Sequence, residues 1–121
     1  MQIINISGSG FTIDAKTKLY IEKKIMKLVD YIPRHARKSA AAEVTMRKAE
    51  SRGTDKLECT VIMNLPGKQL VAKEVRDGAL AAIDGAESKI TSQIRRYKAE
   101  LFKAREQEGI LSRVKNIMRK K

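Results

Sequence analysis

The chain has 121 residues, 33% of them charged, and a formal net charge of +12 at pH 7. This length suits one domain with one core, and the charge favours a polyanionic partner: nucleic acid before an anionic membrane or an acidic protein. One cysteine excludes an intrachain disulfide, and no apolar run approaches the roughly 18 residues that span a bilayer. With no signal segment at the start, we expect a soluble, cytoplasmic protein.

Residues 2–7 predict a first strand, because they contain three isoleucines and precede glycines at positions 8 and 10. A phosphate-binding loop needs a third glycine or a Lys-Ser/Thr pair, so a simple turn is favoured. Asp14 is suited to cap a helix that runs to about Tyr31 and stops before Pro33. Apolar residues share one side of this helix and lysines the other; the sets are Ile21, Ile25, Leu28 and Ile32, against Lys16, Lys23 and Lys27 with Lys24 at the flank.

Alternating apolar and polar residues predict two further strands, at residues 42–47 and 57–63, and a last strand at residues 69–75 is expected after a tight turn. A basic loop at residues 34–38 precedes them, and its His35 is expected to be solvated. A hairpin loop at residues 48–56 joins the first two of these strands, and the Pro66-Gly67 turn joins the last two. Cys59 is expected to be a core residue rather than a reactive thiol.

Residues 79–105 predict one long helix. Its core side carries apolar residues at helical spacing, and Lys89, Arg96 and Lys103 share the opposite side at spacings of seven. Gly109 is expected to end or bend this helix. The rest is a basic amphipathic segment that could pack on the domain, lie on an anionic membrane or fold on RNA. The core-side residues are Ile83, Ile90, Ile94, Tyr97 and Leu101.

The order of elements predicts an α+β fold, a βαβββα two-layer sandwich. We expect a four-stranded, mostly antiparallel sheet with two helices packed on one face, and a parallel first strand pair. Residues 1–108 would form this domain and residues 109–121 the basic tail. The outward lysines and arginines of both helices then combine into one positive face. Acidic residues are scarce there, with Asp30 and Glu100 as the main exceptions, which favours binding over plain solvation.

Catalysis finds little support, because no nucleophile is paired with a base and no metal-ligand spacing occurs. We therefore expect no enzyme activity, no catalytic residue, no metal and no cofactor. Aromatic residues make up only 4% of the chain, and none alternates with basic residues on a predicted strand. Recognition of RNA is thus expected through its backbone and shape, with binding that weakens steeply as salt rises.

Three stretches resemble the ribosome hibernation-promoting factor and ribosome-associated inhibitor family. They are residues 3–8, IINISG; residues 21–28, IEKKIMKL; and residues 70–98, LVAKEVRDGALAAIDGAESKITSQIRRYK. Within the last, Ala-Ala-Ile-Asp and the Lys-x-x-x-Gln-x-x-Arg/Lys pattern are the most specific pieces. The similarity covers about residues 1–104. The family often has a basic residue where this chain has Ser92.

The resemblance implies a non-enzymatic translation inhibitor in the decoding channel of the small ribosomal subunit, over the mRNA and tRNA sites. Its partners are 16S rRNA and the 70S ribosome, with no small-molecule substrate or stable membrane association, and we expect a monomer off the ribosome. Long members add a dimerisation domain; with only the tail, self-driven ribosome pairing is not expected here. The alternative is a general binder of structured RNA. Matched positions assign RNA contacts to Lys24, Lys27, Lys89 and Arg96, and proximity adds Lys23, Arg95, Lys98 and Lys103.

Overall fold

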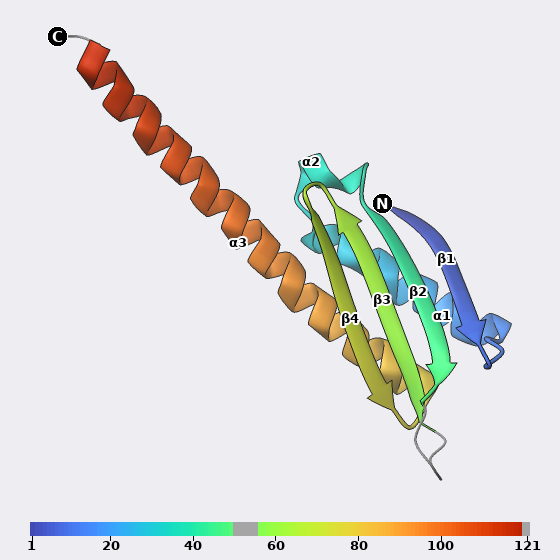
Figure 1. The fold of residues 1–121 in the computed structure, drawn as a ribbon. Coiled ribbons are helices and arrows are strands. Elements are labelled where there is room, and N and C mark those ends of the chain that lie inside the picture. The colour runs from blue at the N-terminus through green and yellow to red at the C-terminus, as the bar shows by residue number, and fades with distance from the viewer. Residues whose placement is uncertain (50–55, 120–121) are drawn as a thin grey trace.

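Four strands and two long helices form an α+β sandwich, and the predicted βαβββα order is confirmed. The computed structural model describes residues 1–49 and 56–119, with the backbone alone at 107, 108 and 110–119. The sheet has the order β1-β2-β3-β4; β1 is parallel to β2, and the other neighbours are antiparallel. The elements are β1 (Gln2–Ser9), α1 (Ala15–Lys27), the 3-10 turn η1 (Leu28–Tyr31), α2 (Arg34–Arg37), β2 (Ala41–Lys48), β3 (Leu57–Leu65), β4 (Lys68–Arg76) and α3 (Ala79–Arg119) (Figure 1).

Two glycines lie where β1 ends: Gly8 is within the strand, and Gly10 follows it in the turn that the sequence predicts. Gly10 has a φ of 65°, in the left-handed region that other residues rarely adopt. At Gly8, an added Cβ would lie 1.8 Å from the carbonyl oxygen of Phe11. Both positions therefore require glycine for the backbone to turn from β1 toward α1.

Helix α1 begins where the sequence predicts, because Asp14 caps it. The Asp14 carboxylate accepts a hydrogen bond from the backbone N–H of Thr17 at 2.7 Å. Hydrogen bonding to the Thr17 side chain and then to its backbone lowers the pKa of Asp14. Residues 34–37 form α2 rather than the expected loop. Ala36 explains this difference, since it is fully buried and its N–H donates to the carbonyl of Pro33 at 2.9 Å.

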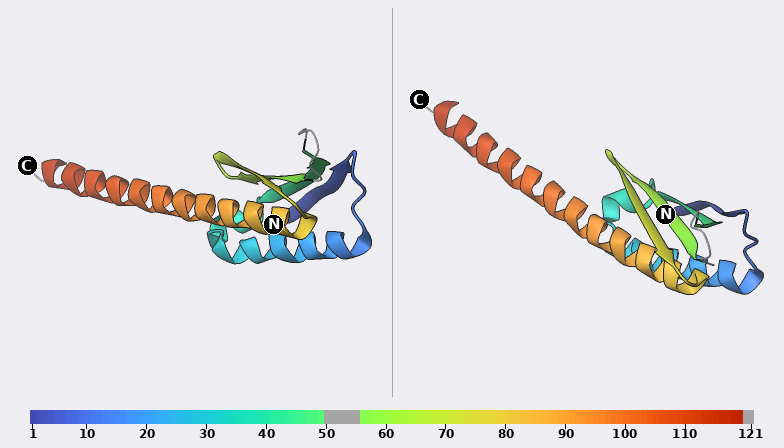
Figure 2. Two further views of the ribbon diagram at one scale, coloured as in Figure 1. Left: turned by 90° about the horizontal axis from the view of Figure 1, so that it is seen from below. Right: turned by 60° about the horizontal axis from the view of Figure 1, so that its bottom comes forward.

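Both long helices cover the same face of the sheet, as the view from below shows (Figure 2). The side that α1 turns to the sheet includes Ile21 and Ile25, and the corresponding side of α3 includes Ile83, Ile90 and Ile94. All five are 0% exposed. Burial of such a side chain contributes about 1.5–3 kcal/mol. The apolar sides predicted for the two helices are confirmed.

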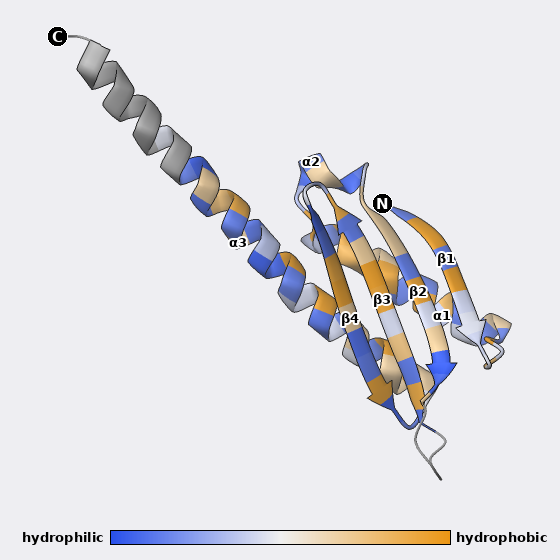
Figure 3. Cartoon of the chain, in the orientation of Figure 1, coloured by the Kyte–Doolittle hydropathy of each residue, from blue (hydrophilic) through white to orange (hydrophobic). Residues whose placement is uncertain are grey.

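β2 and β3 supply buried residues at alternate positions to the core, and β4 adds Leu70 and Ala72. Figure 3 shows apolar and hydrophilic segments along these strands. Val44 lies opposite Val61, and Met46 lies opposite Cys59, all of them fully buried beneath the helices. Burial raises the pKa of the Cys59 thiol to about 12, so it stays protonated and unreactive at neutral pH. The prediction that Cys59 is a core residue is confirmed.

Helix α3 is longer than the sequence predicts. It has 41 residues and extends well past the sheet (Figure 1). The expectation that Gly109 ends the helix is wrong, because Gly109 lies within α3. Its φ is not positive, in contrast to the φ of Gly10 and of Gly67. A glycine permits either conformation, and its neighbours on both sides favour the helix. The apolar spacing predicted for residues 110–118, and most of the hairpin loop at 48–56, lie outside the described side chains.

Candidate nucleic-acid interface

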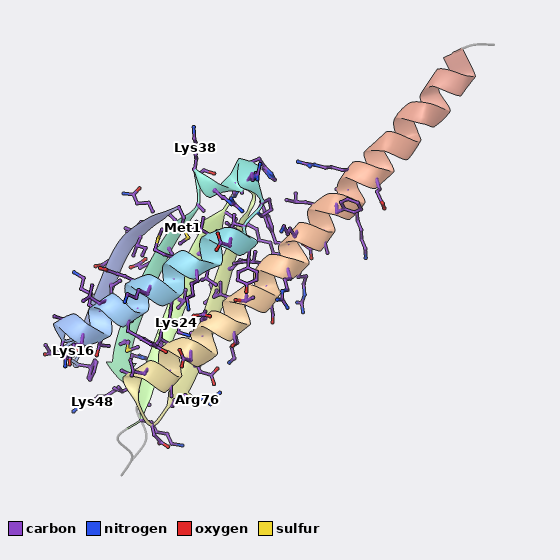
Figure 4. All side chains as sticks on the ribbon, turned by 180° about the vertical axis from the view of Figure 1, so that it is seen from behind. Met1, Lys16, Lys24, Lys38, Lys48 and Arg76 are labelled. Carbon is purple, nitrogen blue, oxygen red and sulfur yellow. The ribbon has the colours of Figure 1, made fainter. Side chains whose placement is uncertain are left out.

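Exposed cations lie on the sides of α1 and α3 that are not buried in the core. One of them, Arg96, lies on the flank of α3 toward β4, where it lines a pocket with Lys68 and Leu70. Figure 4 views the helices from the side away from the sheet and labels Lys16 at the start of α1. Arg96 and Lys103, seven residues apart, are about 10 Å apart along α3. We call the following set the basic face: Lys16, Lys23, Lys27, Arg96 and Lys103, all exposed. In the described part of the chain, none of the five is in an ion pair.

Lys24 is placed differently, because it lies between α1 and α3 (Figure 4). Its Nζ is 3.3 Å from Asp84 Oδ1 and 3.7 Å from Glu87 Oε2, and it lies 5.5 Å from the centre of the Tyr20 ring. The hydrogen bond with Asp84 raises the pKa of Lys24 above its ordinary value. Lys24 therefore stays charged, but two carboxylates neutralise most of its charge locally.

These contacts correct the expectation that Asp30 and Glu100 are the main acidic residues near the predicted face. Asp84 and Glu87 also lie there, since both pair with Lys24 where α1 meets α3. Asp84 additionally accepts a hydrogen bond from the Tyr20 hydroxyl at 2.6 Å. Ion pairs and a hydrogen bond therefore link α1 to α3 at this point.

Lys89 turns toward the sheet instead of away from it. Its Nζ donates to the backbone carbonyl of Lys73 at 2.8 Å and lies 2.7 Å from Glu74 Oε2. One turn further along α3, Gln93 donates to the carbonyl of Val71 at 2.9 Å. β4 is the edge strand here, so these two side chains satisfy carbonyls that no strand pairs. The prediction that the Lys89 side chain points outward with the other cations is wrong, because its ammonium group contacts β4.

Arg95 and Lys98 lie where α3 passes η1 and α2. The guanidinium carbon of Arg95 is 5.5 Å from the centre of the Tyr31 ring, a cation–π arrangement. Lys98 lines a cleft of about 190 Å³ together with His35. Six of the eight predicted site residues are thus exposed, with Arg96 on the β4 flank of α3 and Arg95 and Lys98 on the flank toward η1 and α2, while Lys24 and Lys89 are engaged in ion pairs.

Two residues of this region were missed by the sequence interpretation. Phe102 and Arg105 line the same cleft as Lys98, and they follow Lys98 in α3 by four and seven residues. That spacing places all three on one helical side, so the pattern was available in the sequence. It was overlooked because only the strands were searched for aromatic residues next to basic ones.

The basic face can bind anions but offers no chemistry for a reaction. Lysine and arginine donate to phosphate oxygens, and arginine does so with a planar fork. Among the described residues, no group of three His, Cys, Asp or Glu side chains could hold a metal ion. In the same residues, no helix combines the length and hydropathy needed to cross a membrane.

The fold and this surface define a small α+β domain with a cationic helical face. The family described as "Sigma 54 modulation protein / S30EA ribosomal protein" matches residues 4–101. The chain therefore belongs to this family.

Individual proteins and solved structures that resemble the chain are consistent with this family assignment. The chain is 30% identical over 110 residues to a ribosome hibernation promotion factor from Deinococcus radiodurans, an alignment that covers 90% of this chain and 55% of that protein. The chain thus spans about half the length of that curated relative. The N-terminal domain of Protein Y from Thermus thermophilus superposes with a TM-score of 0.69 at 26% identity, covering 80% of this chain and 99% of that domain. A ribosomal subunit interface protein from Coxiella burnetii shares the fold, with a TM-score of 0.65, 22% identity and coverage of 82% and 99%.

Proposed function

We propose that this chain is a ribosome-associated translation inhibitor, a hibernation factor that binds 16S rRNA in the decoding channel of the small ribosomal subunit. The observation that carries the proposal is the basic face, whose five cations project from two helices without ion-pair partners among the described residues. The hibernation promotion factor of D. radiodurans, by its name, supports a role at the ribosome. A ribosomal partner also implies a cytoplasmic location.

The mechanism is steric occupation. The cations of the basic face neutralise rRNA phosphates, and the sheet beneath keeps both helices in a fixed relation, so the domain binds as a rigid body. In the decoding channel it fills the space that mRNA and tRNA need, and translation stops while it stays bound. No bond is made or broken, and neither a cofactor nor a small-molecule substrate is required.

The two parts of the chain have different tasks in this proposal. Residues 1–108 supply the binding face, and residues 109–121 add further positive charge. The charge of +12 favours a monomer off the ribosome, because copies repel one another, and we expect rRNA to compete for the protein better than an anionic membrane does, so that no stable membrane association forms. Both 30S subunits and 70S ribosomes are targets.

Competition on purified small subunits tests the proposal. We expect the protein to sediment with the subunits and to be displaced when mRNA and tRNA are added in excess, since they occupy the same channel. A 20-base-pair RNA duplex at equal phosphate concentration serves as the control competitor and is expected to displace little protein. If the duplex competes as well as mRNA and tRNA, the chain is a general binder of structured RNA.

A further inference from the structure

A cleft opens at the point where α3 leaves the body of the domain. It has a volume of about 190 Å³ and lies between α3 and the start of α2. Leu101 is half-buried and packs against the core, whereas its neighbour Phe102 is 65% exposed, the largest exposure among the large hydrophobic side chains described. The residues that line the cleft are Pro33, His35, Lys98, Leu101, Phe102 and Arg105.

The surroundings of Phe102 distinguish it from an ordinary exposed apolar residue. Lys98 lies one turn before it and Arg105 nearly one turn after it, both lining the same cleft, and His35 adds a second ring. None of the six lining residues is acidic. Next to the cleft, Arg95 lies over Tyr31, a ring that is 39% exposed. Exposed rings between cations are the combination with which proteins bind single-stranded RNA, because the rings stack on bases while the cations contact phosphates.

The size of the cleft limits which ligands it can hold. Sites that enclose a whole small molecule usually measure about 300–1,000 Å³. A cleft of 190 Å³ suits a single planar ring whose sugar and phosphates stay outside. Lys98 and Arg105 line the same cleft as Phe102 and are cations that can contact those phosphates.

We propose that this cleft binds one unpaired nucleobase, stacked on Phe102, with the flanking phosphates held by Lys98 and Arg105. The inference rests on the proposed function, because the unpaired nucleotide would belong to the same RNA that the basic face binds. This nucleotide would contact the domain near η1 and α2. Besides contacts to the RNA backbone, the protein would then prefer an RNA with an unstacked base at this point. A paired base cannot enter, since its ring faces are covered by its neighbours in the helix.

An RNA hairpin with a single bulged 2-aminopurine, compared with its fully paired counterpart, tests the stacking. We expect the wild-type protein to quench the bulged base and to bind the bulged hairpin more tightly. Phe102→Leu should weaken that binding about tenfold, within the range found for stacking aromatics, and leave the paired hairpin unaffected. Phe102→Tyr keeps the ring and should bind as the wild type does. Because Phe102 is largely exposed, both variants should melt at the wild-type temperature.

The control is Lys103→Gln, next to Phe102 on the basic face, which should weaken both hairpins equally. If Phe102→Leu binds the bulged hairpin like the wild type, the stacking site is refuted. It is also refuted if Phe102→Leu loses binding to small subunits but not to the bulged hairpin, since a protein surface then occupies the cleft. Binding of the wild type to small subunits is measured separately. Failure of the stacking site therefore leaves the proposed ribosome binding intact, and failure of ribosome binding can be detected independently of the stacking site.

Discussion

Lys89 and Glu74 join α3 to the edge strand β4, with 2.7 Å between Nζ and Oε2. The same Nζ donates to the carbonyl of Lys73, and Arg76 reaches the other carboxylate oxygen of Glu74 at 2.7 Å. A lysine that helical spacing assigns to the outer surface is thus held against the sheet. Its contribution to folding and its contribution to RNA binding can be separated by experiment.

Lys89→Met should lower the Tm by a few degrees, because it removes a charge-assisted hydrogen bond and leaves the Lys73 carbonyl without its donor. Arg96→Met is the matched change on the basic face, and it should leave the Tm unchanged. Their effects on small-subunit binding should be reversed, with Arg96→Met the weaker binder. Thermal melts and sedimentation of the two variants make the comparison; a larger binding loss for Lys89→Met would return Lys89 to the interface.

Glu74 should contribute to the loss of stability in acid. Hydrogen bonds from Lys89 and then Arg76 hold the pKa of Glu74 below its ordinary value of 4.5. Its stabilisation is therefore complete above about pH 4.5 and is lost as the pH falls through the lowered pKa of the folded state. Glu58 and Asp14, whose pKa values are also lowered, act in the same direction. Glu74→Gln should start from a lower Tm at pH 7 and lose less between pH 5 and pH 3; parallel melting curves for both proteins would count against this contribution.

Gly8→Ala should destabilise the domain by about 2 kcal/mol, because its Cβ would lie 1.8 Å from a backbone oxygen and the turn must move to relieve the clash. Ser9→Ala is the control one residue away, and its effect should stay within about 0.5 kcal/mol. Urea unfolding of both variants measures the difference. Equal midpoints would show that the turn accommodates a side chain.

Gly109→Ala should stabilise its part of the chain, in contrast to Gly8→Ala. Apart from its own helix backbone and chain neighbours, no described atom lies within 4 Å of an added Cβ at this position, and alanine favours a helix over glycine by about 0.5–1 kcal/mol. We expect a higher helix content by far-ultraviolet circular dichroism. A glycine that ended the helix in a left-handed conformation would instead make the alanine variant less helical, so this change tests the continuity of α3 directly.

Periodicity in the sequence predicted the features that depend on burial. Ile94 and Val44 fall into patterns of 3.6 and 2 residues, and both are fully buried where the sheet meets the helices. The cap at Asp14 and the turn at Gly67 depend on local chemistry and were equally predictable. Local sequence therefore determined the elements and their order.

Features that depend on distant partners were not predictable in this way. Helical spacing gives the direction of the Cα–Cβ bond, but the long side chains of Lys24 and Lys89 bend toward carboxylates that the spacing does not reveal. Asp84 lies 60 positions after Lys24, and Glu74 belongs to a strand. The cleft at Phe102 similarly combines α3 with Pro33 and requires the tertiary structure to be seen.

The most direct measurement compares small-subunit binding by two double variants of equal net charge. Lys27→Glu with Arg96→Glu reverses two positions of the basic face, and Lys18→Glu with Lys48→Glu reverses two exposed lysines outside it. At physiological salt we expect the first variant to bind more than tenfold more weakly, with a salt dependence reduced by about two phosphate contacts, and the second to bind almost as the wild type does. Equal losses in the two variants would mean that net charge alone drives binding, and the assigned face would be wrong.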